Sequence, residues 1–450
     1  MTPPRFVVVG GGASGTLLAA QLLRQAKRPV EVVVVEPDRI GRGVAYGTTH
    51  REHLMNVPSG RMSAFPDQAD HFVRWLERAG EPADPAGFAP RPVYGEYLES
   101  ALADAAQRDE SGVALHRVRD RATAVRPCAG GARVELQSGR TLQARRVALA
   151  LGNLTGPGPI SLASASPRYV ADPWSPGALE RIPSGDPVLV LGTGLTMVDV
   201  ALTLRTHEHA APIHAVSRRG LLPRAHGEPS LPEPALLPPR HPPSLRGWLR
   251  WARSRRETEP GGDWRPVVDA LRPITQEVWD RLDVAERQRF LRHLRPCWDV
   301  HRHRMPPVVA AALAELLRTG RLEVVAGRVR GIRSDDDGFD VRIDPRGADR
   351  CLGVRVGWIV NATGPETDVT RARSPLLQQV LQDGHARPDE LQLGLDATPA
   401  GALLDSNGKP SDTLFTLGPP LRGRLWETIA VPEIRKQAQD MAAAWLAAGT

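Results

Sequence analysis

The chain has 450 residues, of which 41% are apolar and 24% are charged. This length predicts two or three domains, and no apolar run approaches the roughly 20 residues of a membrane-spanning helix. The first apolar run enters a glycine-rich turn directly, without the pattern of a secretory leader. We therefore expect a soluble, cytoplasmic protein that has no membrane partner.

The net charge of +7 could indicate a nucleic-acid partner. The basic residues, however, are spread over the chain in short clusters and match no nucleic-acid-binding motif, so we expect none. The three cysteines, Cys128, Cys297 and Cys351, are too widely spaced for a metal site and odd in number for a disulfide framework. No metal is expected.

Residues 5–36 predict a strand, a helix and a second, fully apolar strand. Between the first strand and the helix lies the turn Gly10-Gly11-Gly12-Ala13-Ser14-Gly15, which has the glycine spacing of a dinucleotide site. Gly10 would permit the turn, Gly12 the approach of a pyrophosphate, and Gly15 the packing of helix on strand. Glu36, at the end of the second strand, is placed to accept hydrogen bonds from ribose hydroxyls.

Helices are predicted around residues 69–80 and 94–108, and strands at 116–125, 132–139 and 145–152. A proline-rich connector at 152–187 leads to a second strand–helix–strand unit at 188–217. Its turn has Gly192 and Gly194, followed by Leu195 and Thr196, with Met197 in place of the third glycine.

The second unit ends in Ser217-Arg218-Arg219 instead of an acidic residue. Two guanidinium groups can bind the 2′-phosphate that a carboxylate would repel, so this unit predicts an NADPH site. The alternative is that both arginines are merely solvated. At the first unit Glu36 excludes a 2′-phosphate, and a flavin beside a hydride donor makes a redox pair, so FAD is expected there.

After a second proline-rich stretch, residues 245–318 read as helical, and we expect a helical insertion over about 225–318. Strands follow at 321–329, 339–343 and 355–364, and a helix at 431–449 ends the chain. The predicted fold is α/β, with two Rossmann-like dinucleotide-binding domains: an FAD domain formed by residues 1–170 plus 345–450, and an NADPH domain at 171–344.

Several motifs resemble a known family: "GRGVAYGT", "HLMNVPSGRMSAFP", "VYGEYL", "GTGLTMVDVAL", "WDVHRHRMPP" and "LWETIAVPEIR". They are similar to the bacterial FAD-NAD(P)-binding protein family, and more distantly to two-dinucleotide flavoprotein monooxygenases and amine N-hydroxylases. The resemblance implies that main-chain groups of Val125 face the adenine and that Gly152 marks the strand crossing near the flavin. It implies further cofactor contacts from Arg42, Gly43, Val44, Ala45, Asn56, Arg61, Gly418, Trp426 and Glu427.

The segment 298–304 gathers proton-transfer and anion-binding side chains, and its catalytic candidates are Asp299, His301, Arg302 and His303. An extended conformation would place the two histidines on one face and Arg302 with Arg304 on the other. The alternative interpretation is a salt-bridged connector.

Three functions remain open. The first is an FAD-dependent, NADPH-using monooxygenase that acts on a small polar molecule, possibly an amine. The second is a flavin reductase or dehydrogenase that inserts no oxygen. The third is a non-catalytic, flavin-bound redox sensor. The sequence gives no oligomeric state.

Overall fold

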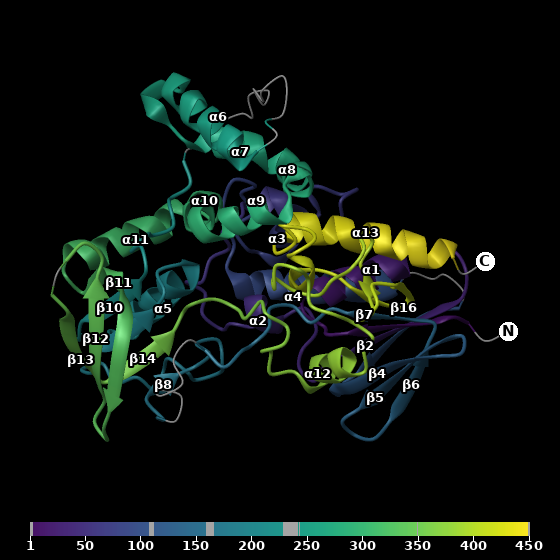
Figure 1. Ribbon diagram of the computed structural model, residues 1–450. Helices are drawn as coiled ribbons and strands as arrows, with labels where there is room; N and C mark the ends of the chain where they lie inside the picture. The colour runs from purple at the N-terminus through teal and green to yellow at the C-terminus, as the bar shows by residue number, and fades with distance from the viewer. Residues whose placement is uncertain are drawn as a thin grey trace. The chain divides into compact units, whose positions relative to one another are not determined.

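The computed structural model describes residues 3–107, 112–158, 166–227, 242, 244–348 and 350–448. The chain divides into two compact units. Unit 1 comprises Met1–Arg51, Val57–Gly156 and Glu366–Thr450, and unit 2 comprises Glu52–Asn56 and Pro157–Pro365. Each unit contains its own sheet and its own glycine-rich turn, as the predicted pair of Rossmann-like domains requires (Figure 1).

The sheet of unit 1 has six strands in the order β15-β16-β7-β1-β2-β3. Its strands are β1 (Arg5–Val9), β2 (Val30–Val35), β3 (Val113–Val118), β7 (Arg146–Leu149), β15 (Ala402–Leu404) and β16 (Pro410–Thr416). All neighbours run parallel except β15 and β16. The valine-rich β1 and β2 are buried almost throughout, as strands covered on both faces must be.

Helices and a small second sheet complete unit 1. The helix α1 (Ala13–Gln25) packs against α4 (Arg91–Ala106) and α13 (Val431–Ala447), while α12 (Pro375–Gln382) packs on β4. The second sheet is antiparallel and consists of β4 (Ala122–Cys128), β5 (Gly131–Leu136) and β6 (Thr141–Ala144). The remaining short elements are α2 (Gly43–Tyr46), η1 (Ser59–Arg61), α3 (His71–Ala79) and η6 (Pro419–Leu421).

The prediction of one strand over 116–125 was wrong. The chain turns after Val118, so that β3 lies in the six-stranded sheet and β4 begins the antiparallel one. The polar residues Arg119, Asp120 and Arg121 separate the two strands, and Asp120 accepts a hydrogen bond from the N–H of Arg121.

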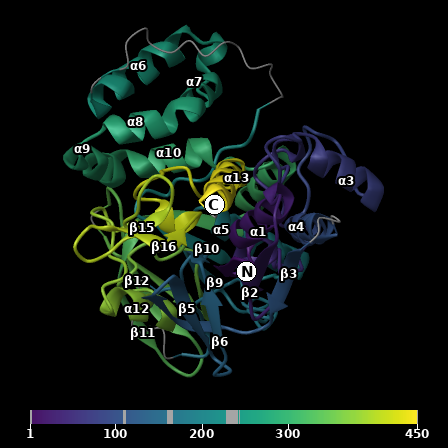
Figure 2. The same cartoon turned by 90° about the vertical axis from the view of Figure 1, so that its right-hand side faces the viewer.

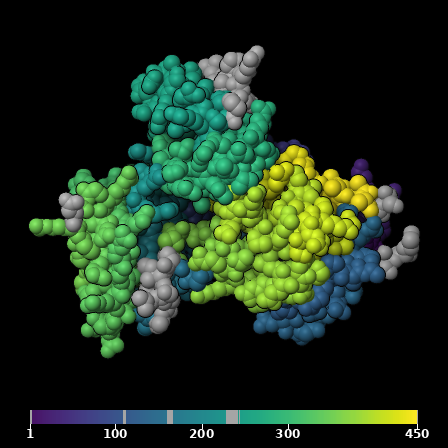
Figure 3. All heavy atoms as spheres, viewed as in Figure 1, coloured from purple at the N-terminus to yellow at the C-terminus, as the bar shows by residue number. Residues whose placement is uncertain are grey.

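The sheet of unit 2 has seven strands in the order β13-β12-β11-β10-β9-β14-β8. The parallel strands are β8 (Tyr169–Val170), β9 (Val188–Leu191), β10 (Ile213–Ser217), β11 (Leu322–Ser334) and β14 (Trp358–Asn361), while β12 (Phe339–Pro345) and β13 (Leu352–Val356) are antiparallel. Alternate residues of β12 are exposed, and Figure 3 shows this light-green part of the chain at the surface.

Residues 157–170 and 345–365, together with Glu52–Asn56, belong to unit 2, although we expected them in the FAD domain. The physical reason is backbone pairing, because β14 runs beside β9 from Trp358 to Asn361 and β8 pairs with β14. Parts of both proline-rich stretches, residues 159–165 and 228–241, lie outside the described residues.

The helical insertion is real but shorter than predicted. Its described helices are α6 (Leu245–Thr258), η3 (Pro260–Gly262), α7 (Arg265–Leu271), η4 (Arg272–Ile274), α8 (Thr275–Arg281), α9 (Val284–Arg289), η5 (Phe290–Leu294) and α10 (Arg295–Arg302). In this group α6 packs on α7 and α7 on α10, and Figure 2 shows them gathered together. In contrast, α11 (Pro307–Arg318) buries Val309, Leu313 and Leu316 in the core beside α5 (Leu195–Thr206).

No helix among the described residues is both long and apolar enough to span a membrane. The helix α6 combines tryptophan and arginine side chains. Its Trp248 is buried and stacks edge-on against Trp251 at 5.8 Å between ring centroids. The apolar side of α6 is therefore used for packing within the protein.

His209, just after α5, makes the stability of unit 2 depend on pH. It is 1% exposed, and neither ring nitrogen has a hydrogen-bond partner among the described residues. Burial lowers its pKa, and Arg321 lowers it further. Its folded pKa thus lies below the unfolded value of about 6.5, so stability is complete above that pH and falls as the pH drops through the folded pKa.

We expect His209→Leu to raise the free energy of unfolding by about 1–3 kcal/mol, because an unpaired buried polar group is removed. It should also flatten the loss of stability between pH 7.5 and 5.5. Urea titrations at both pH values measure this, with the exposed His116→Gln as the control. Equal pH dependence of the unfolding free energy in wild type and His209→Leu would show that His209 is not the source of this loss of stability.

Candidate dinucleotide sites

The first glycine turn joins β1 to α1 in the geometry that the spacing predicts. Gly10 has φ +101°, and a Cβ there would lie 2.4 Å from the carbonyl oxygen of Ala150. A Cβ on Gly15 would lie 1.9 Å from the oxygen of Gly10. A side chain at either position would clash with the backbone, so both positions require glycine.

Gly12 differs from these two glycines. It has φ −68° and ψ −169°, which any residue can adopt, and a Cβ would meet only the Cα of Gly43 at 3.5 Å. Gly12 is the N-cap of α1, and no side chain caps that helix end. The first turn of α1 therefore presents backbone N–H groups that no side chain caps, which fits an incoming phosphate.

Glu36 follows β2 and reaches the same turn. Its Oε2 accepts the N–H of Gly11 at 2.6 Å, and its Oε1 accepts the N–H of Asp38 at 3.2 Å. These bonds fix the carboxylate beside the turn, and each oxygen keeps a further lone pair for a ribose hydroxyl. The geometry thus fits the role predicted for Glu36.

The short helix α2 lies next to this turn, since Gly43 and Gly12 approach each other closely. Val44 is 43% exposed, which is unusual for a large apolar side chain, and Gly43 and Ala45 are also exposed. Arg42 instead points toward α4, where its Nη1 donates to the oxygen of Pro92 at 2.8 Å. Residues 43–45 are therefore better placed than the Arg42 side chain to contact a cofactor.

The second glycine turn joins β9 to α5 in unit 2. Gly192 has φ +111°, and a Cβ there would lie 2.3 Å from the oxygen of Ala362, which follows β14. Gly194 caps α5 without any side-chain bond, and a Cβ there would meet nothing within 4 Å. Met197, in place of the third glycine, is fully buried in the core of unit 2. Leu195 and Thr196 are half-buried in the first turn.

The three residues after Val216 differ in whether their side chains are free to bind a phosphate. The hydroxyl of Ser217 bonds to that of Thr193 at 2.8 Å and accepts the N–H of Gly220 at 3.0 Å. Arg218 is exposed and bonds to none of the described residues, whereas Nη1 of Arg219 lies 3.8 Å from the sulfur of Cys297 in α10. Two guanidinium groups thus remain available for a phosphate, while Ser217 mainly fixes the turn.

One residue suggested by the resemblance needs correction. The N–H of Val125 donates to Oε1 of Gln379 at 2.8 Å, and its carbonyl accepts from Nε2 of the same side chain at 3.3 Å. The N–H is therefore not available to an adenine ring. Gln379 comes from α12, 254 residues further along the chain, and nothing in the local sequence around Val125 points to it.

The remaining residues of the resemblance are distributed as follows. Gly152, with φ +63°, follows β7, and Arg61 is exposed in unit 1. Asn56 belongs to unit 2, where its carbonyl lies 3.0 Å from Nε2 of His226. Trp426 and Glu427 are buried in unit 1, and the guanidinium of Arg422 stacks over the Trp426 ring at 4.6 Å.

Arg295–Arg302 form the helix α10, as the helical pattern of residues 245–318 predicts, so the extended arrangement considered for 298–304 does not occur over these residues. Nδ1 of His301 lies 2.7 Å from the carbonyl oxygen of Cys297, one turn earlier, and its ring meets Trp264 edge-on at 4.5 Å. His303 lies 4.0 Å from Asp299, and Arg302 is 7% exposed. Burial lowers the pKa of His301, which favours its neutral form at pH 7.

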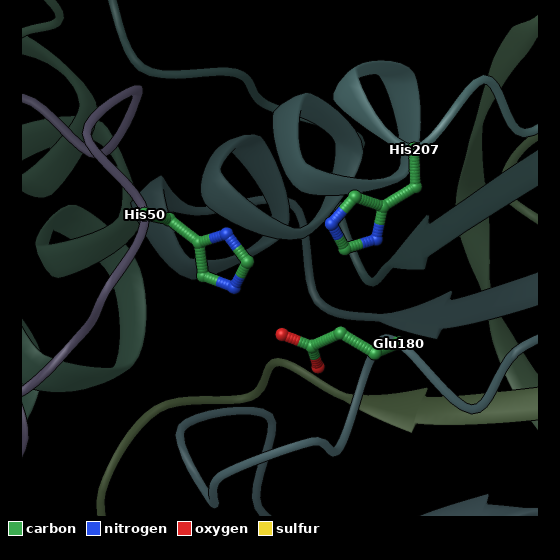
Figure 4. A group of neighbouring side chains, drawn as sticks. All are labelled: His50, Glu180 and His207. Atoms are coloured by element: carbon green, nitrogen blue, oxygen red, sulfur yellow. The ribbon is translucent and has the colours of Figure 1, made fainter.

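Figure 4 shows His207, at the end of α5, and Glu180, both in unit 2, together with His50 of unit 1. Two of these side chains are exposed, and the group is divided between the units. We assign no metal to it.

The fold and the two turns define a chain with two Rossmann-like dinucleotide-binding units. A family model described as FAD-NAD(P)-binding matches residues 7–154, which confirms the predicted resemblance over that range. Comparison with curated proteins gives no match.

Solved structures share the fold over the whole chain. Ornithine hydroxylase from Pseudomonas aeruginosa is 12% identical with a TM-score of 0.68, and 99% of each chain is covered. Ornithine N-hydroxylase from Kutzneria sp. 744 is 16% identical with a TM-score of 0.67, covering 98% of this chain and 99% of its own. The cadaverine monooxygenase of Erwinia amylovora, bound to FAD, is 14% identical with a TM-score of 0.67, covering 98% and 94%.

Proposed function

We propose that the protein is an FAD-dependent, NADPH-using monooxygenase that hydroxylates the amine nitrogen of a small polar substrate. The observation that carries this proposal is the pair of open helix N-termini in one chain, at Gly12 with Glu36 nearby and at Gly194 in the unit that carries Arg218 and Arg219. The first set suits FAD and the second suits NADPH. Bound FAD would supply the redox chemistry, accepting a hydride from NADPH and reacting with oxygen.

The amine substrate is inferred from the solved structures that share the fold, whose names specify ornithine and cadaverine. The test is to purify the protein with FAD and to measure NADPH oxidation, oxygen consumption and hydroxylamine formation with L-ornithine, L-lysine and cadaverine. Oxygen uptake coupled to a hydroxylated amine supports the proposal. Electron transfer to an artificial acceptor without oxygen insertion would favour a reductase, and FAD that NADPH never reduces would favour a sensor.

Within this function we propose His301 as a proton-transfer residue, together with its neighbours Asp299, Arg302 and His303. The half-buried, neutral imidazole can accept a proton near pH 7. We expect His301→Ala to retain FAD and NADPH affinity while product formation falls by about 10²–10⁴-fold and hydrogen peroxide accumulates instead.

His293→Ala is the matched control, since His293 is an exposed histidine of the same insertion. Wild-type coupling in His301→Ala would show that the bond to Cys297 and the contact with Trp264 serve packing alone.

A further inference from the structure

Three hydrogen bonds close a ring at the C-terminal end of unit 1. The N–H of Gly418 donates to Oε1 of Gln437 at 3.1 Å, and Nε2 of Gln437 donates to Oγ1 of Thr428 at 2.5 Å. The hydroxyl of Thr428 in turn donates to the carbonyl of Gly418 at 3.1 Å. The ring joins both ends of the loop 418–428 to a single side chain of α13.

This ring lies at the N-terminal end of α1. Gly418 has φ +76°, and a Cβ there would be 2.3 Å from Oγ of Ser14. Ser14 belongs to the first turn of α1, directly after Gly12 and Ala13, where no side chain caps the helix. The base of the loop therefore packs against the helix end that we assign to the FAD pyrophosphate.

The Thr428 side of the ring is protected from water, whereas Gln437 is half-buried. Thr428 is 1% exposed and Ser14 is 5% exposed, while Trp426 within the loop is 2% exposed. Hydrogen bonds in such surroundings are stronger than at the surface, and a missing partner is costly. The beginning of the loop is also fixed, because the carbonyl of Pro420 accepts the N–H of Leu395 at 2.8 Å.

We propose that Gln437 and Thr428 are positioning residues that hold loop 418–428 against the dinucleotide end of α1, so that the loop forms a fixed wall of the FAD site. This inference rests on the proposed FAD site in unit 1. Neither side chain needs to touch the cofactor, because each acts through Gly418 and the loop that follows it.

The test compares Thr428→Val, which removes the hydroxyl at nearly constant volume, with Thr428→Ser, which retains it. Gln437→Met removes the amide, and Gln437→Glu keeps the acceptor for Gly418 but loses the donor to Thr428.

The measurements are the Kd of FAD for the apo-protein, and the absorption spectrum and midpoint potential of the bound flavin. We expect Thr428→Val and Gln437→Met to weaken FAD by roughly three- to tenfold and to shift the spectrum, since each removes two of the three hydrogen bonds of the ring. Thr428→Ser should recover both properties.

Gln25→Met is the matched control. Nε2 of Gln25 in α1 donates to the carbonyl of Gln439 in α13 at 3.1 Å, so this bond joins the same two helices away from the loop. It should lower the melting temperature without altering the flavin spectrum. If the wild type binds no FAD, the proposed function fails. If it binds FAD and the ring variants have wild-type Kd, spectrum and potential, or if Gln25→Met shifts the spectrum equally, only this inference fails.

Discussion

Gly12→Val is expected to fold but to lose FAD, with a Kd raised by roughly 10²–10⁴-fold. The backbone at Gly12 suits valine, and its Cβ would make an ordinary contact with Gly43. The larger side chain would, however, fill the space in front of the N–H groups of α1. Two charge-assisted bonds to the pyrophosphate would be lost at about 1.5–3 kcal/mol each. Flavin content after purification and titration of the apo-protein measure the effect.

Gly15→Ala provides the contrasting control. Its Cβ would lie 1.9 Å from the oxygen of Gly10, so helix and strand would have to separate. This variant should lower the melting temperature of the apo-protein, whereas Gly12→Val should leave it nearly unchanged. A yellow Gly12→Val protein with full FAD occupancy would disprove the site.

Changing Arg218 and Arg219 together to alanine is expected to weaken NADPH by roughly 2–4 kcal/mol, or about 30- to 1000-fold in Kd, while NADH is nearly unaffected. The reason is that only NADPH carries the 2′-phosphate that two guanidinium groups can bind. Arg218 makes no competing bond to a described residue, and Arg219 makes only a weak one to Cys297. Binding titrations with both nucleotides measure the difference.

The double variant Arg246→Ala/Arg250→Ala is the matched control, because it removes two exposed arginines of the same unit from α6. This control variant should bind NADPH and NADH with the same affinities as the wild type. Equal losses of NADH and NADPH in the Arg218/Arg219 variant would refute the assignment of the phosphate site.

Local patterns predicted the parts of the fold that depend on residues close in sequence. The glycine turns, the helices that follow them and the ends of β2 and β10 are specified within about 40 residues each, because hydrophobic period and turn chemistry act locally. The open geometry at Gly12 and the position of Glu36 followed from the same patterns.

Contacts between distant segments could not be predicted in this way. The bond from Gln379 to Val125 spans 254 residues, and β14 joins β9 across 170 residues between Val188 and Trp358. The sequence nevertheless contained a clue to the pairing of β14 with β9. Ala150-Leu151-Gly152 and Ala362-Thr363-Gly364 are similar tripeptides, and each follows an apolar strand. The structure shows both alanine carbonyls beside the first glycine of their own unit.

The helix α10 shows how a charged segment can mislead. Alternation of histidine and arginine would give two distinct faces only in an extended segment, but Pro296 lies in the first turn of a helix in which Val300 and Arg302 are buried. Proline in the first turn favours a helix, and this local rule outweighed the apparent alternation.

The discontinuous path of unit 1 bears on the order in which the protein is made. β7 needs both β1, near the start of the chain, and β16, which begins at Pro410, as neighbours in its sheet. During synthesis the ribosome releases nearly all of unit 2 as one continuous stretch before β16 and α13 exist. Domains generally fold as units, and contacts distant in sequence form slowly. Unit 2 can therefore fold on the nascent chain, while unit 1 must wait for the last residues to leave the ribosome.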